Sequence, residues 1–423
     1  MGPLRRDAEA IWRAALRAVE PERLVAGQAA ALRAAAQAAE RVIVVGGGKA
    51  AAGLAAGVVA ALGPDLLAAH DVAGLVSVPA GSGRSLGRIE VRETRPLGVN
   101  LPTPEVVAAT REMLGLVAGA GPRDLVLAVI TGGGSALLAA PRAGISLEEK
   151  IAVTRRLSEA GADIATLNAA RREMSLVKGG GLARTCGAGR LIALVLSDVI
   201  SGDLAVIASG PCHDAAAVGG AWTTPRGCRV EQVIVGSNAT AVDAAAAAAW
   251  DLGYEVAIDA AVDGEPAEAE GRRLALRGLE RLTAARDGRP RAVIAGGEAT
   301  VRVPPAHGRG GRNQQTALAA LAEVQAQAGE WPAGLLVASV GTDGEDGPTD
   351  AAGGVIDAAV AGAIDAAAVT AALERCDAYP VLAASGGLIR TGPTGTNVAD
   401  VKIVLASHSA TREKPSGPSL GAD

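Results

Sequence analysis

One stretch, residues 41–52, constrains the fold more than any other part of the chain. It reads R-V-I-V-V-G-G-G-K-A-A-A, which is four β-branched residues, three glycines, a lysine and the start of an alanine-rich segment. This order predicts a buried strand that turns sharply into a helix whose first N–H groups are exposed. Such a corner suits an anion, because the glycines let it approach the backbone and Lys49 adds a positive charge. A plain strand–turn–helix with a solvated lysine fits the same letters, so both readings stay open at this point.

Further apolar strands alternate with helices along the rest of the chain. We predict them at residues 74–78, 89–93, 125–130, 191–196, 230–235, 254–258, 292–295, 335–340 and 401–405. The alternation predicts a layered α/β architecture with mostly parallel sheets, and residues 300–303 are expected to form a hairpin with 292–295. Thr103 before Pro104 and the Ser146/Glu149 pair predict two helix N-termini.

Six of these strands end in loops rich in Gly, Ser or Asp. The second such loop reads Thr131-Gly132-Gly133-Gly134-Ser135 and follows a strand that is apolar throughout. Ligands of parallel sheets bind beyond the carboxyl ends of the strands, so six such loops on one chain predict a shared binding cleft.

Composition narrows the class of protein. A chain of 423 residues with 49% hydrophobic content predicts two domains with sizeable cores, and the boundary is expected within residues 215–290. The net charge of −5, the absence of a basic block and the lack of any Phe argue against nucleic-acid binding, and we expect no membrane association. Four scattered cysteines without metal-ligand spacing predict free thiols and a cytoplasmic protein.

The glycine loops fit phosphoryl transfer better than dinucleotide binding. Lys49 is not in a Walker A loop, because Ile43 and Ala50 occupy the positions of its first glycine and its Ser/Thr. The loose dinucleotide fingerprint lacks its acidic residue after the second strand. Phosphoryl transfer needs cations and carboxylates around glycine amides. The chain offers Lys49, Lys178, Arg171 and Arg312 as cations, and Asp198, Asp343, Asp346 and Asp400 as carboxylates. Each has a structural alternative as a cap, a turn or a solvated charge. We favour function for Lys49, Asp198 and Arg312.

The ordered set of motifs resembles the glycerate 2-kinase family, whose members also carry the name hydroxypyruvate reductase of tartrate utilisation. The resemblance spans about residues 8–407. It rests on G-G-G-K at 46–49, T-G-G-G-S-A-L at 131–137, G-A-D-I at 161–164, N-A-A-R at 168–171, K-G-G at 178–180, S-D-V at 197–199, I-A-S-G-P at 207–211, G-G-E-A-T-V at 296–301, G-R-G-G-R-N-Q at 308–314, G-T-D-G-E-D-G-P-T-D-A-A-G at 341–353 and T-G-P-T-G-T-N-V-A-D at 391–400.

This resemblance implies a two-domain α/β fold and an ATP-dependent kinase. The expected division is a Rossmann-like domain with a mostly parallel sheet over residues 1–235, a smaller MOFRL-type α/β domain over 236–408 and a disordered tail over 409–423, with the active site in the interdomain cleft. The implied reaction is phosphorylation of D-glycerate, or a closely related hydroxy acid, at the 2-hydroxyl. The products would be 2-phospho-D-glycerate and ADP, and the protein would be a monomer or homodimer.

The resemblance also implies roles for residues. Lys49 and Arg312 match the lysine and arginine regarded as functional in the family, and we predict them to be catalytic together with Asp198. Asp198 and Asp343 are the predicted Mg²⁺ ligands. Predicted contacts to ATP come from Gly46, Gly47, Gly48, Gly132, Gly133, Gly134, Ser135, Lys178, Asn313, Thr394, Thr396 and Asn397.

Several positions beside the motifs depart from the family pattern. Leu101 and Glu173 stand where histidines are usual, and Arg172, Gly181 and Gln315 also differ. Two alternatives stay open. An NAD(P)H-dependent hydroxypyruvate reductase is disfavoured by the missing acid after the second strand and by the lack of a histidine acid in any loop, and a diverged protein that binds a small acid without catalysis draws support from the departures.

Overall fold

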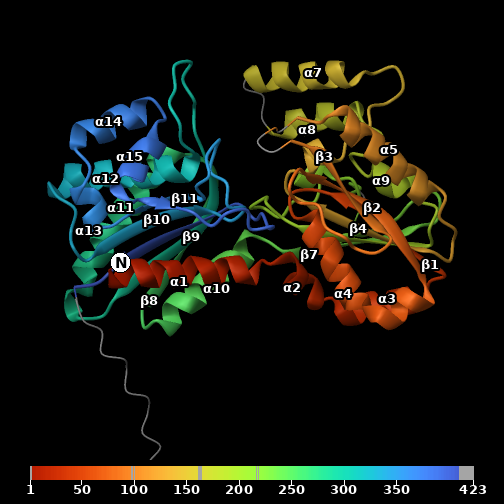
Figure 1. The fold of residues 1–423 in the computed structure, drawn as a ribbon, viewed down its shortest axis with the longest axis horizontal. Coiled ribbons are helices and arrows are strands. Elements are labelled where there is room, and N and C mark those ends of the chain that lie inside the picture. Colours follow the sequence, from red (N-terminus) through yellow and green to blue (C-terminus); the bar gives the residue numbers. More distant parts are fainter. Residues whose placement is uncertain are drawn as a thin grey trace, which may run out of the picture. The chain divides into compact units, whose positions relative to one another are not determined.

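The computed structural model describes residues 2–96, 99, 101–160, 164–215, 217 and 219–408. These form two compact units, each built on one β-sheet (Figure 1). The seven-strand unit comprises Ala18–Ser237 and Gly395–Val398, and the six-strand unit comprises Met1–Arg17, Asn238–Thr394 and the chain from Ala399 onward. The predicted tail and most of the G-A-D-I motif lie outside the described residues. The first helix belongs by its contacts to the six-strand unit, whereas the predicted division placed it in the N-terminal domain.

The seven-strand unit has a doubly wound sheet of the predicted Rossmann-like kind. Its strand order is β3-β2-β1-β4-β5-β7-β6, and every pairing is parallel except that of β6 with β7. Its elements are α2 (Pro21–Ala26), α3 (Ala29–Gln37), β1 (Arg41–Gly47), α4 (Ala51–Ala69), β2 (Asp71–Pro79), β3 (Ile89–Arg95), α5 (Pro104–Ala118), β4 (Leu125–Thr131), α6 (Gly134–Leu137), α7 (Leu147–Glu159), α8 (Ile164–Glu173), α9 (Gly181–Thr185), β5 (Arg190–Leu196), η1 (Ile207–Ser209), β6 (Ala221–Thr223) and β7 (Arg229–Gly236).

Successive side chains of the strands point to opposite faces of this sheet, and helices cover both faces. Ile43 and Val45 of β1 point into a core shared with Met113 of α5 and Leu182 of α9. Helix α4, backed by α2 and α3, packs on the sheet from the other side (Figure 1). Among the described residues, α4 is the one helix long and apolar enough to cross a membrane, and 56% of that window is buried in the fold, as a core helix requires.

Local sequence signals set several helix starts as predicted. Thr103 caps α5 by accepting a hydrogen bond from the N–H of Val106. Ser146 and Glu149 form the reciprocal capping box at the start of α7, with N···O distances of 2.7 and 3.1 Å.

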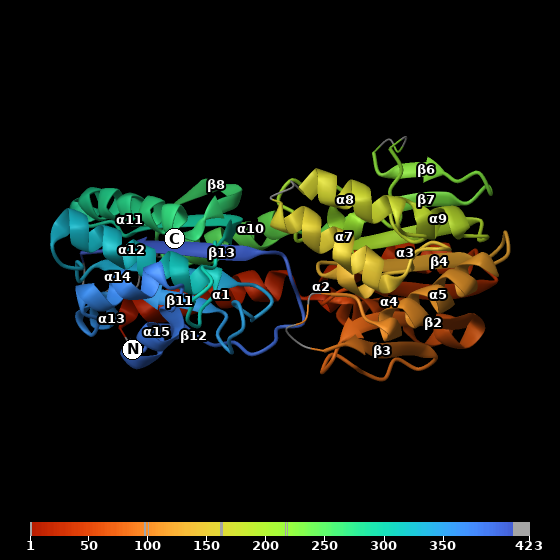
Figure 2. The same ribbon diagram turned by 90° about the horizontal axis from the view of Figure 1, so that it is seen from above.

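The six-strand unit is mixed rather than mostly parallel. Its strand order is β12-β11-β10-β13-β9-β8, and the β8–β9 pairing alone is parallel in this sheet of described residues. Its elements are α1 (Pro3–Ala18), α10 (Asn238–Asp251), β8 (Glu255–Pro266), α11 (Ala267–Ala284), η2 (Ala285–Asp287), β9 (Arg291–Thr300), α12 (Arg312–Ala328), β10 (Leu335–Gly341), β11 (Gly353–Ile356), α13 (Ala358–Gly362), α14 (Ala366–Glu374), α15 (Ala378–Ser385), β12 (Leu388–Ile389) and β13 (Asp400–Ala406). Figure 2 shows α11 and α12 side by side in this unit.

The prediction of mostly parallel sheets is therefore wrong for this unit, for a topological reason. The crossover through α12 does join two parallel strands, because β9 and β10 are both antiparallel to β13. However, β13 comes from the end of the chain and inserts between them. An insertion over such a sequence distance leaves no local signal in the strands themselves.

The predicted hairpin of residues 300–303 with 292–295 is also wrong. Strand β9 continues through Gly296 and Gly297 to Thr300 and pairs with β8 over that length. The two glycines permit close approach instead of a turn. A Cβ at Gly296 would lie 1.7 Å from Asn238 Oδ1, and one at Gly297 would lie 2.1 Å from the carbonyl oxygen of Val262.

Candidate active site

The two glycine loops meet at the switch point of the seven-strand sheet. Strands β1 and β4 are neighbours, and the chain leaves β1 toward one side of the sheet and β4 toward the other. The backbone N–H of Lys49 donates to the carbonyl of Gly132 at 2.9 Å, and the N–H of Ala50 donates to Thr131 Oγ1 at 3.2 Å. In open α/β sheets this crevice is where ligands bind. The predicted loops at 46–48 and 132–134 thus form one structure.

Glycine is required where these loops touch. Gly48 has a φ of +143°, and a Cβ there would lie 2.0 Å from Thr131 Oγ1. Gly133 has a φ of +74° at the start of α6, and its Cβ position is 3.2 Å from Lys49 Cγ. Both positions are in backbone regions that side chains disfavour, so the tight contact and the chain direction depend on glycine.

Asp198 and Asn397 lie against the second loop. The Cβ position of Gly132 is 2.3 Å from Asp198 Oδ2 and 2.6 Å from Asn397 Nδ2. Asp198 follows β5, whereas Asn397 comes from the short segment Gly395–Val398 that belongs to this unit. Thr396 anchors that segment, because its hydroxyl donates to the carbonyl of Val19 at 2.6 Å and is buried. The fold therefore gathers Lys49, Asp198 and Asn397 around one glycine loop.

Lys178 is a buried residue that contacts the backbone of the second glycine loop at Ser135. Its side chain is 3% exposed, and its Nζ donates at 3.2 Å to the carbonyls of Ser135 and Ala208. Ser135 Oγ in turn lies 3.0 Å from the hydroxyl of Ser209. Burial, and then the nearby Lys150 and Arg171, hold the pKa of Lys178 well below its ordinary value. Lys178 therefore contacts the backbone of Ser135, and a direct contact of Lys178 with ATP stays a prediction.

A cavity of about 200 Å³ lies beside the second loop in the same unit. Gly133 and Ser135 form one part of its wall, and three cationic side chains, Arg95, Lys150 and Arg171, form another. They come from β3, α7 and α8 respectively, and α7 and α8 lie side by side (Figure 2). Sequence reasoning named Arg171 as a general cation and missed Arg95 and Lys150.

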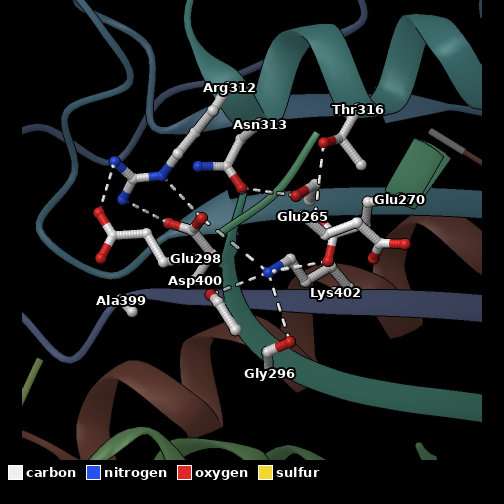
Figure 3. Close-up of polar contacts among 12 residues, drawn as sticks. Glu265, Glu270, Gly296, Glu298, Arg312, Asn313, Thr316, Ala399, Asp400 and Lys402 are labelled. Carbon is white, nitrogen blue, oxygen red and sulfur yellow. Dashed lines mark hydrogen bonds and ion pairs between the residues drawn. The ribbon is translucent and has the colours of Figure 1, made fainter. Parts of the chain in front are cut away.

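In the six-strand unit, Arg312 is held by two carboxylates (Figure 3). Its Nε and Nη2 donate to the two oxygens of Asp400, each at 2.8 Å, and Nη1 lies 3.0 Å from Glu298 Oε1. Burial lowers the pKa of Arg312, but Asp400 and then Glu298 raise it by more, so the guanidinium stays charged. These contacts use three of its five N–H groups and leave two for another anion.

Asp400 itself is fully buried and depends on a second cation. Lys402, also fully buried, places its Nζ 4.0 Å from Asp400 Oδ2 and 3.2 Å from Glu270 Oε1, and donates to the carbonyl of Gly297 at 2.9 Å (Figure 3). Burial raises the pKa of Asp400, but Arg312 and Lys402 lower it by more. The sequence indicated Asp400 only as a general carboxylate, and no motif in it marks Lys402 or Glu270.

The remaining predicted residues of this unit have structural contacts. Asn313 is buried and accepts a hydrogen bond from Ser339 Oγ at 2.5 Å, and Asp346 accepts from the N–H groups of Asn313 and Gln314 at the start of α12. Burial raises the pKa of Asp346 to about 6. Thr394 donates to the carbonyl of Thr342 at 2.5 Å, and Asp343 accepts from the N–H of Glu345 at 3.1 Å.

A second cavity, of about 350 Å³, adjoins the N-terminus of α12. Its wall includes Arg312, Gln315, His307 and the apolar side chains of Val301 and Val303.

Within the described residues there is no group of three or more His, Cys, Asp or Glu side chains that could hold a metal. Mg²⁺ is commonly held by one or two carboxylates together with substrate phosphates, so Asp198 and Asp343 stay the predicted ligands.

Comparisons with known proteins cover most of the chain. Family models match residues 7–234 as a domain of unknown function, DUF4147, and residues 291–400 as the MOFRL family. The D-glycerate 2-kinase of Thermotoga maritima is 37% identical over 351 residues, covering 76% of this chain and 82% of that protein. The glycerate kinase of Homo sapiens is 33% identical over 432 residues, with 82% of each chain covered. The crystal structure of the T. maritima glycerate kinase matches with a TM-score of 0.79 at 34% identity, over 95% of this chain and 99% of that one.

Proposed function

Because the chain belongs to the glycerate kinase family and is an enzyme of that kind, we propose that it phosphorylates D-glycerate at the 2-hydroxyl. ATP is the proposed donor, and the products are 2-phospho-D-glycerate and ADP. One structural observation supports this most directly: Lys49 and Asp198 both lie against the second glycine loop at the switch point of a parallel sheet. This arrangement offers backbone amides, a cation and a carboxylate within one crevice.

The groups at this crevice fit distinct parts of the reaction. Gly46 and Gly47 belong to β1, which pairs with β2 and β4, and the N–H of Gly48 donates to the carbonyl of Ser77 at 3.2 Å. The amides of Gly132–Gly134 and the ammonium of Lys49 are therefore the groups suited to oxygens of the transferred phosphoryl group. Asp198 is suited to orient the attacking 2-hydroxyl and accept its proton. Asn397 is beside Asp198 at Gly132 and can donate a hydrogen bond to a bound oxygen.

Mg²⁺ and Arg312 complete the proposal. Bound Mg²⁺ would neutralise charge on the phosphates of ATP, and Asp198 and Asp343 are the residues proposed to hold it. Arg312 is proposed to stabilise the charge that develops on the phosphoryl group, a role worth on the order of 10³–10⁵ in rate. Its fixed orientation follows from the bidentate contact with Asp400.

The cellular setting is part of the same proposal. Cys186, Cys212, Cys228 and Cys376 are free thiols, which supports the reducing cytoplasm as the compartment. The protein is proposed to act as a monomer or homodimer on small molecules.

A coupled assay tests the proposal. The protein is incubated with Mg²⁺, ATP and D-glycerate, and the product is detected with enolase in the absence of phosphoglycerate mutase, because enolase uses the 2-phosphate and not the 3-phosphate. Formation of phosphoenolpyruvate supports phosphorylation at the 2-hydroxyl, and ADP release without it refutes that position.

A parallel assay addresses the alternatives. NADH oxidation with hydroxypyruvate would indicate a reductase, although the acidic residue expected for dinucleotide binding is absent from the end of β2, which reads Ser77-Val78-Pro79. Inactivity in both assays would leave a binding protein or another substrate.

A further inference from the structure

The basic cavity of the seven-strand unit has a charge pattern that calls for an anion. Arg95, Lys150 and Arg171 line it, and the first two are 3% and 4% exposed. Lys178, whose Nζ donates to the carbonyl of Ser135, is a fourth basic group, close enough for Lys150 and Arg171 to lower its pKa. The wall, as far as the chain is described, contains no Asp or Glu. Buried charges of one sign, such as those of Lys150 and Arg171, are costly unless an opposite charge compensates them.

The electrostatics of two of these groups agree with that reading. Burial, and then the charge of Arg171, lower the pKa of Lys150 to about 8. Burial likewise lowers the pKa of Arg171, whose Nη1 donates to Asn168 Oδ1 at 3.4 Å. No described carboxylate contributes to the shift at either group. A bound anion would supply the missing partner.

The size and position of the cavity select the kind of anion. A volume of about 200 Å³ is below the roughly 300–1,000 Å³ of pockets that enclose drug-sized ligands, so it suits a small acid better than a nucleotide. Gly133 belongs to its wall and also lies 3.2 Å, at its Cβ position, from Lys49 Cγ. An acid whose carboxylate lies against Lys150 and Arg171 could therefore present its hydroxyl end to the glycine loop.

We propose that this cavity binds the carboxylate of the acceptor hydroxy acid, with Lys150 and Arg171 as its principal partners and Arg95 as a third. The proposal rests on the function proposed above and deepens it, because it assigns the substrate carboxylate to these cations and leaves Lys49 for the transferred phosphoryl group. It also makes Lys150 and Arg171 determinants of specificity for acids over neutral polyols.

Two neutral variants and one control test the assignment. Lys150→Gln and Arg171→Gln each remove one cation, and Arg155→Gln removes an exposed cation from the same helix, α7. The KM for D-glycerate, the KM for ATP and the dissociation constant for D-glycerate from calorimetry are measured for each. We expect the two glycerate constants to rise about 10- to 100-fold in both pocket variants, because each loses a charge-assisted contact, while the KM for ATP stays within about twofold. Arg155→Gln should match the wild type.

Other outcomes overturn the assignment. Unchanged glycerate constants in folded variants would refute it, and a rise in the KM for ATP alone would make the cavity a phosphate site. Lys150→Arg retains the charge and should recover most of the lost affinity, which a purely structural role would not predict. If a neutral variant fails to fold, reductive methylation of the wild type is followed by mass spectrometry. Protection of Lys150 by D-glycerate supports the proposal, and equal labelling refutes it.

The wild type separates this proposal from the proposed function. If the wild type binds D-glycerate but does not phosphorylate it, and the variants lose that binding, the kinase reaction is refuted and the carboxylate site is supported. Phosphorylation that the variants retain with unchanged KM would refute the pocket and keep the reaction. A wild type that neither binds nor phosphorylates glycerate would refute both.

Discussion

Replacing Lys402 by methionine should strongly destabilise the six-strand unit. The ammonium of Lys402 is fully buried, lies 3.2 Å from Glu270 Oε1, and donates to the carbonyl of Gly297 at 2.9 Å. Methionine fills a similar volume but leaves Glu270 and Asp400 as buried carboxylates with one cation fewer. Burial already raises the pKa of Glu270 despite the presence of Lys402.

The magnitude follows from the cost of an uncompensated buried charge. Removing one partner of a buried ion pair costs about 3–5 kcal/mol. With a slope of about 2 kcal/mol per molar urea, the unfolding midpoint of this unit should fall by roughly 2 M. Glu270 keeps Arg273 at 3.4 Å and Thr316 at 3.5 Å, which favours the lower part of that range.

Pulsed hydrogen exchange with mass spectrometry across a urea series measures this unit separately. Peptides from β9 and β13 report the loss of stability of the six-strand unit. Peptides from β1 and β4, in the seven-strand unit, serve as the reference in the same sample. Arg272→Met, an exposed change on α11, should stay within about 0.5 kcal/mol of the wild type.

A double variant tests the reasoning further. Neutralising Glu270 together with Lys402, as Glu270→Gln with Lys402→Met, should recover about 1–3 kcal/mol relative to the sum of the single changes, because the charges compensate each other. A midpoint for Lys402→Met within about 0.5 M of the wild type, or strictly additive variants, would show that this network does not compensate buried charge as described.

Three further predictions concern the glycine loops and the basic cavity. Lys49→Ala should abolish kinase turnover with nearly unchanged thermal unfolding, and near-native turnover would refute its catalytic role. Gly132→Ala should lower kcat/KM at least about 10-fold with little loss of stability, because its Cβ would lie 2.3 Å from the end of the Asp198 side chain; unchanged kinetics would show that Asp198 is not needed in that position. Because the pKa of Lys150 is lowered to about 8 in the folded protein and is ordinarily about 10.4, the unfolded chain binds its proton more tightly. The free energy of unfolding should therefore rise from about pH 8 to pH 10 by more in the wild type than in Lys150→Gln, and the KM for D-glycerate should rise over the same range in the wild type. Parallel pH profiles for the two proteins would contradict the assigned pKa.

Patterns within a few residues correctly predicted several strand ends and helix starts, because these depend on interactions between residues close in sequence. The β-branched run before Gly46, the capping box at Ser146 and the proline start after Thr103 all became the expected strand and helix ends. The glycine loops were found from sequence because glycine is needed where backbone segments approach closely, and their contact at the switch point follows from a parallel sheet.

The roles of several charged residues could not be predicted in this way. The K-G-G motif gave no sign that Lys178 would be buried, with its Nζ donating to the carbonyl of Ser135. Arg95 and Lys150 belong to no recognisable sequence motif. They are candidate binding residues only because three separate segments of the chain bring them, with Arg171, to the wall of one cavity.

By itself, the sequence determined the α/β class, the two glycine corners and the family, because these depend on residue order over short stretches. Tertiary structure alone decided that β13 inserts between β9 and β10, and so places Asp400 against Arg312 and Lys402. It also decided which cations are buried together without a carboxylate among the described residues of the cavity wall. Burial and pairing are set by segments far apart in the chain, and they fix the energy of a charge more strongly than its immediate neighbours do.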